Sequence, residues 1–90
     1  MKNIEMKKFG SVLNGRPSAK EAVARVRQMV NGSGEDIQLD FSLVDVLTPS
    51  FADEFANGLA EHYPTKKVTY FGLEKNQSIT ETLKAVNIQV

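Results

Sequence analysis

The residues of this chain that could do chemistry are few, and most of them are carboxylates. Asp40, Asp45, Asp53 and Glu54 lie near one another in the sequence, but their spacing matches no cation-binding loop. The chain has no cysteine and one histidine, His62, which excludes thiolate chemistry and clusters of histidine ligands. It also has no Gly-x-Ser-x-Gly elbow and no glycine-rich phosphate loop. We therefore expect no enzymatic activity, no bound metal and no cofactor.

Three serines predict the elements that must position these residues. Each serine is followed three positions later by an acid, which is the pattern of a helix capping box. An apolar stripe with helical spacing follows each pair. The expected helix ends are Asn31–Gly34, Pro64 and a position near Asn87. The three pairs are Ser18 with Glu21, Ser50 with Asp53, and Ser78 with Glu81.

Extended segments are expected between these helices. Residues 37–41 alternate, residues 67–72 are rich in β-branched and aromatic side chains, and residues 3–9 are a weaker candidate. Residues 88–90 could add an edge strand. The order β-α-β-α-β-α predicts an α/β fold, with a small, largely parallel or mixed sheet of about four strands and three helices. A length of 90 residues predicts one domain over residues 1–90.

The charges of the chain cancel overall but are segregated along it. Residues 1–27 hold seven Lys or Arg, whereas residues 28–65 hold none and carry seven acids. A pI of about 6.6 argues against a nucleic-acid binder. The absence of a long apolar run argues against a membrane span or signal peptide, so a cytoplasmic protein is expected. The acidic stretch predicts a partner with a basic surface and binding that weakens as salt rises.

The segment from Leu39 to Phe55 is the most distinctive part of the chain. A strand runs into an apolar connection, then into Thr48-Pro49-Ser50 and a helix. This order resembles the STAS domain family, which comprises sulfate-transporter and anti-sigma-factor-antagonist domains. It is most similar to small STAS-like domains of unassigned function, through the sequence Ser-Phe-Ala-Asp-Glu at residues 50–54. Phe9-Gly10 and Arg16 add to the resemblance, which extends over residues 9–86.

The resemblance implies a regulatory domain that binds another protein. Anti-sigma-factor antagonists bind an ATP-binding serine kinase of the GHKL type, and phosphorylation of a serine in the turn switches them off. Superposing the turns puts Pro49 at the phosphorylated serine, and proline has no hydroxyl. A phosphoacceptor would therefore have to be Ser50 or Thr48. For Ser50, we favour a helix cap over a phosphoacceptor.

We expect a non-enzymatic regulatory interaction domain that binds a protein, such as a GHKL-type ATPase or kinase, at the turn before the second helix. The alternative is an assembly module that forms a homodimer through this helix or a sheet edge. Phe51 either packs under the connection at 43–47 or faces the partner, with Gly58 allowing close approach. The expected partner-binding residues are Thr48, Pro49, Ser50, Phe51, Asp53 and Glu54.

Arg16 and the apolar stripes give two further expectations. Arg16 is expected to pair with Asp40 or Asp45 at a strand end, or else to bind an anion together with the start of the second helix. A third and weaker functional hypothesis, an anion or nucleotide binder, depends on that second role. The helical spacing places Val26, Phe55 and Leu59 among the most buried side chains.

Overall fold

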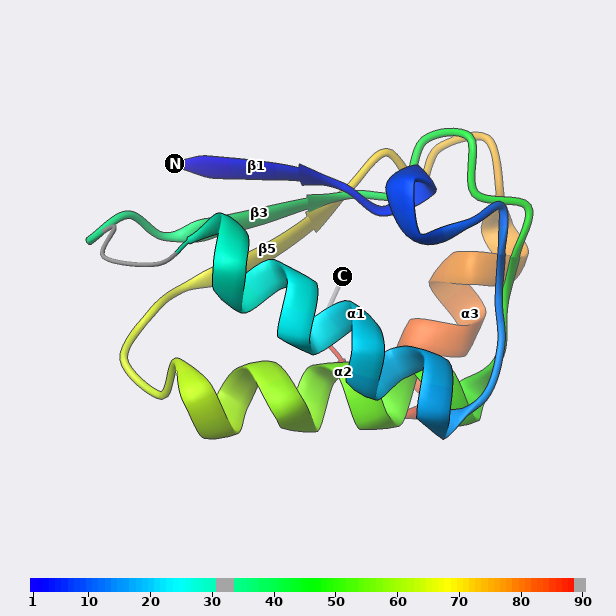
Figure 1. Cartoon of the computed structure of the whole chain (residues 1–90). Coiled ribbons are helices and arrows are strands. Elements are labelled where there is room, and N and C mark those ends of the chain that lie inside the picture. The colour runs from blue at the N-terminus through cyan, green and yellow to red at the C-terminus, as the bar shows by residue number, and fades with distance from the viewer. Residues whose placement is uncertain (31–33, 89–90) are drawn as a thin grey trace.

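The computed structural model describes residues 1–30 and 34–88, which form an α/β arrangement of parallel strands and helices (Figure 1). The elements in chain order are β1 (Lys2–Glu5), the 3-10 helix η1 (Met6–Phe9), β2 (Val12–Leu13), α1 (Arg16–Met29), β3 (Ile37–Asp40), β4 (Val46–Leu47), α2 (Pro49–His62), β5 (Val68–Phe71) and α3 (Gln77–Ala85).

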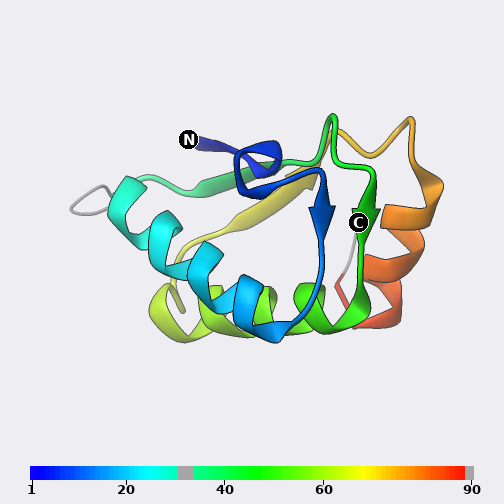
Figure 2. The ribbon, with the colours of Figure 1, turned by 45° about the vertical axis from the view of Figure 1, so that its right-hand side comes forward.

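The strands form two separate parallel sheets. The larger sheet has the order β1-β3-β5, and α1 and α2 lie side by side under one of its faces (Figure 1). The smaller sheet pairs β2 with β4, with Val12 opposite Val46. Figure 2 shows that this pair runs from the large sheet down to the starts of α1 and α2. It therefore closes one end of the molecule, and we call it the ribbon.

The core lies between the large sheet and the helices. Val26, Phe55 and Leu59 are 0%, 3% and 1% exposed, which confirms the prediction from the helical stripes. Gly58 also has a structural role, because a Cβ atom built on it would lie 2.8 Å from Cγ2 of Val23. The glycine lets α1 and α2 approach closely along a contact that we call the helix seam.

All three predicted helix caps are wrong by two or three residues. The N-caps are Gly15, Thr48 and Asn76, so the three serines lie inside the first turn of their helices. Proline explains the shift in α1 and α2, because its fixed φ and missing N–H suit the first turn of a helix. In α3 the Asn76 side chain accepts from the backbone N–H of Ile79 at 3.4 Å.

The predicted helix ends agree with the structure where it describes them. α2 stops at His62, just before Pro64. After α3, Asn87 has a φ of 66° and the N–H of Ile88 donates to the carbonyl of Leu83 at 2.9 Å, as in a Schellman motif. The predicted turn at 31–34 falls mainly on residues 31–33, outside the described residues. So do residues 89–90 of the predicted last strand, and Ile88 is not in a strand.

The strands differ from the prediction in two respects. The first strand stops at Glu5, and Met6–Phe9 form a 3-10 helix instead of continuing it. The two strands of the ribbon were not predicted, because two residues each are too few for an alternating pattern. Within the described ranges, no helix combines the length and the apolar character needed to cross a membrane.

Candidate functional site

Thr48 joins the starts of α1 and α2 into one unit. Its Oγ1 accepts from the backbone N–H of Gly15 at 3.3 Å and of Phe51 at 3.4 Å, and it lies 3.5 Å from the carbonyl oxygen of Leu13. Its own N–H donates to the same carbonyl at 3.0 Å. One hydroxyl therefore caps α2 and also ties the turn before α1 to the turn before α2.

These contacts separate the two predicted phosphoacceptors. The Thr48 hydroxyl is half-buried and engaged with both turns, so a phosphate on it would break the cap. The Ser50 hydroxyl lies 3.4 Å from Oγ1 of Thr48 and is not the cap of the helix. Of the two residues, Ser50 could accept a group with less damage to the fold.

Arg16 pairs with α2 rather than with the strand ends. Its Nη1 lies 3.0 Å from Oδ2 of Asp53 and 3.4 Å from Oε1 of Glu54, so the predicted pairing with Asp40 or Asp45 is wrong. The hydrogen bonds that the guanidinium donates to Asp53, and then to Glu54, raise its pKa above the ordinary value. Asp40 instead accepts from the N–H of Ser42 at 2.8 Å.

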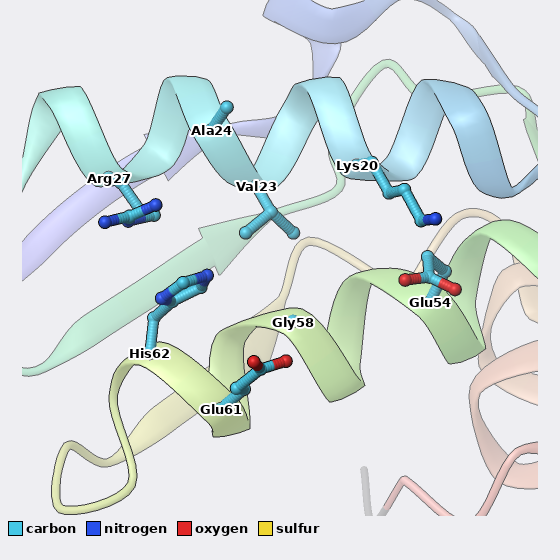
Figure 3. A pocket seen from close by; sticks show the side chains of 8 residues that line it. All are labelled: Lys20, Val23, Ala24, Arg27, Glu54, Gly58, Glu61 and His62. Carbon is cyan, nitrogen blue, oxygen red and sulfur yellow. The ribbon is translucent and has the colours of Figure 1, made fainter.

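The same geometry explains the segregated charges. The basic helix α1 and the acidic helix α2 run side by side, and their charged side chains line a hollow of about 240 Å³ over Val23 and Gly58 (Figure 3). Asp53 and Glu54 lie beyond the first turn of α2, next to Arg16. Asp53, Glu54 and Glu61, three of the seven acids of this stretch, therefore lie beside the chain's own basic helix, which weakens the argument for a basic partner at Asp53 and Glu54.

The predicted partner-binding residues do not form one surface. Phe51 is 1% exposed and its ring stacks on Phe55 with centroids 5.7 Å apart. It packs in the core and is unavailable to a partner in this fold. Pro49 is exposed, while Thr48 and Ser50 are half-buried.

The ribbon exposes apolar side chains that the sequence reading missed. Val12 and Val46 are 56% and 44% exposed, whereas their neighbours Leu13 and Leu47 point into the core. The two valines are directly opposite in the parallel pairing, so their side chains lie side by side on the outer face. Leu43, in the loop before β4, is 76% exposed. The dipeptide Val-Leu, which makes up the whole of each ribbon strand, was the available signal, but it was too short to interpret.

The described residues contain no group of three histidine or acidic side chains placed to hold a metal ion. His62, the last residue of α2, lines the hollow of Figure 3 and is exposed.

Parallel strands joined by helices, with a strand-turn-helix centred on Thr48, form an α/β arrangement consistent with a STAS-like fold. Residues 20–78 match the sequence model of a family described as a STAS-like domain of unknown function (DUF4325), and the chain belongs to this family. The match runs from α1 to the start of α3 and includes the turn at Thr48. No curated protein and no solved structure gives a significant match to the chain.

Proposed function

We propose that this protein is a non-enzymatic regulatory domain that binds another protein through the ribbon and the turn that follows it. The observation that carries the proposal is the pair of exposed valines, Val12 and Val46, on the outer face of the ribbon. Leu43 lies in the loop before β4, and Pro49 lies in the turn after β4. An apolar surface beside a polar turn is typical of a protein-binding site.

Rigidity supports this assignment. The Thr48 hydroxyl ties the two turns below the ribbon together, and the N–H groups of Asp45 and Val46 both donate to the carbonyl of Ser11, at 2.8 and 3.1 Å. A surface that is already ordered loses less conformational entropy when a partner binds. Asp53 and Glu54 contribute less than the sequence indicated, because Arg16 engages both.

The resemblance to anti-sigma-factor antagonists makes a GHKL-type ATPase or serine kinase the first partner to test. We propose measuring its affinity for the wild-type chain and for the double variant Val12→Thr, Val46→Thr, which keeps the shape and strand preference of both residues. Binding should weaken tenfold or more, about 1.4 kcal/mol. The matched control, Lys20→Gln with Arg27→Gln, changes the hollow of Figure 3 and should stay within twofold of wild type. Unchanged binding by the valine variant, or loss in the control, contradicts the proposal.

Ser50 provides a test of whether the turn acts as a switch. We expect Ser50→Asp to bind the partner as well as Ser50→Ala does, because neither removes the Thr48 cap. A tenfold loss confined to Ser50→Asp would instead indicate a phosphoswitch at this residue.

Self-association is the second candidate function. It is favoured by the position of β1 and β5 as the outer strands of the large sheet, since outer strands can pair with a second copy. Light scattering over a dilution series should show a dimer if this candidate is correct. Asn3→Pro, which removes a backbone donor from β1, should then give a monomer if β1 is the pairing edge.

A further inference from the structure

A hollow of about 460 Å³ lies beyond the carboxyl ends of β3 and β5. It is bounded by the loop from Phe41 to Asp45 and by the loop from Gly72 to Asn76. The volume is within the range of about 300–1,000 Å³ found for ligand pockets in proteins.

The two loops that form this hollow are fixed to each other. The Asn76 side-chain amide donates to the carbonyls of Asp45 at 3.0 Å and Val44 at 3.4 Å, while its oxygen caps α3. Gly72 has a φ of 76°, and a Cβ atom on it would lie 2.7 Å from the backbone nitrogen of Ser42. The hollow is therefore preformed rather than dependent on loop movement.

Leu43, at the rim of the hollow, is unusual in two ways. Its φ is 70°, a left-handed conformation that costs a leucine free energy and that glycine or asparagine adopts more easily. Its side chain is also 76% exposed, so it gains little from burial in the free protein. Strained residues concentrate where a protein binds something. A bound partner that covers this side chain would explain both the strained backbone and the exposed leucine.

The charges at the rim indicate the character of that partner. The carboxylates of Asp45 and Glu74 make no hydrogen bond or ion pair within residues 1–30 and 34–88. Lys75 is the cation among the residues that line the hollow. Two unpaired carboxylates beside one ammonium group favour a partner with a positive charge next to its apolar side chain.

We propose that this hollow receives an apolar side chain of a protein partner, and that a lysine or arginine beside it in the partner pairs with Asp45 or Glu74. The proposal rests on the proposed function, because the hollow adjoins the ribbon through Asp45 and Val46. It adds the location of the anchoring side chain and the chemistry of the partner segment.

The probe is a library of random dodecapeptides displayed on phage and selected on the immobilised wild-type chain. Enriched peptides should share a large apolar residue flanked by Lys or Arg. Synthetic copies should bind at least tenfold more weakly to Leu43→Gly and to Leu43→Asn. Both variants suit a positive φ, so their unfolding temperatures should equal or exceed that of wild type. Asp45→Asn should weaken binding at low salt and reduce its salt dependence.

Several results would overturn the proposal. These are failure to enrich peptides, enrichment of acidic peptides, and unchanged binding by both Leu43 variants. If the chain self-associates and Leu43→Gly abolishes this self-association, the occupant of the hollow is a second copy of the chain. That result would also overturn the proposal. If the Leu43 variants bind the protein partner normally while the double variant Val12→Thr, Val46→Thr does not, the proposal that the hollow receives the partner is wrong and the proposed function stands. If all of these variants bind normally, both fail.

Discussion

The helix seam and the ribbon differ in where their side chains find contacts: those of the seam contact each other, whereas those on the outer face of the ribbon are exposed. At the seam, Gly58 lets α1 and α2 approach closely, and the basic face of one helix meets the acidic face of the other. At the ribbon, Val12 and Val46 remain exposed and the nearby Asp45 carboxylate is unpaired in the described chain. Charged groups along the seam find partners within the protein, whereas the ribbon leaves apolar surface exposed that another molecule could cover. Stability should therefore depend on the seam, and binding on the ribbon.

The same substitution in α2, which forms one side of the seam, and in the loop before the ribbon gives the largest expected contrast. Leu59→Ala removes a side chain that is 1% exposed and should lower the free energy of unfolding by about 2–5 kcal/mol. Leu43→Ala keeps the Cβ atom and removes mostly exposed atoms, so it should change the free energy by less than about 0.5 kcal/mol. Urea unfolding followed by circular dichroism measures both. Similar losses in the two variants would show that the division into regions is wrong.

Thr48, which lies where the ribbon meets the seam, comes next. Thr48→Ala should cost about 1–2 kcal/mol, because it removes the acceptor for two backbone N–H groups. Ser50→Ala should cost less than about 0.5 kcal/mol, because Ser50 is not the cap. Chemical denaturation of the two variants side by side checks this order. A larger loss of stability for Ser50→Ala than for Thr48→Ala would indicate that Ser50 is the cap of α2, as the sequence predicted.

Gly58 tests how tightly the seam is packed. Gly58→Ala should cost about 1 kcal/mol net, since the new methyl group meets Val23 but alanine is the better helix former. In a Val23→Ala background the methyl group has room, so Gly58→Ala should become neutral or stabilising. A double-mutant cycle measures this coupling. Additive effects would mean that the two helices do not meet at these residues.

Tyr70 gives the smallest expected effect and a dependence on pH. Its ring stacks on Phe41 with centroids 6.1 Å apart, and burial raises the pKa of its hydroxyl above the ordinary value. The neutral phenol is favoured in the folded state, so its contribution is complete below about pH 10 and is lost as the pH rises through the raised pKa. Thermal unfolding measured between pH 8 and pH 11 should show a shallower decline in Tyr70→Phe. An equal decline in both proteins would contradict burial of this hydroxyl.

Periodicity predicted the three helices and the strand that became β3, whereas the β-branched and aromatic side chains of residues 67–72 predicted β5. The capping-box pattern placed the helix starts wrongly, since a serine in the first turn of a helix and a serine at its cap produce similar sequences. Pro49, which followed the true cap Thr48, was the signal that should have decided this. The candidate site was harder to predict. The exposure of Val12 and Val46 depends on the pairing of two very short strands, and the partner of Arg16 depends on how α1 and α2 pack.

The parallel register has a consequence for the order in which this fold can form during synthesis. β1 leaves the ribosome early, but its partner β3 follows only after η1, β2 and the whole of α1. β5 pairs with the same central strand and emerges after α2. Since every strand pair in residues 1–30 and 34–88 is parallel, none of them can form as a local hairpin. Helical segments are therefore the structures available to the nascent chain, and the large sheet assembles around β3 only after that strand has emerged.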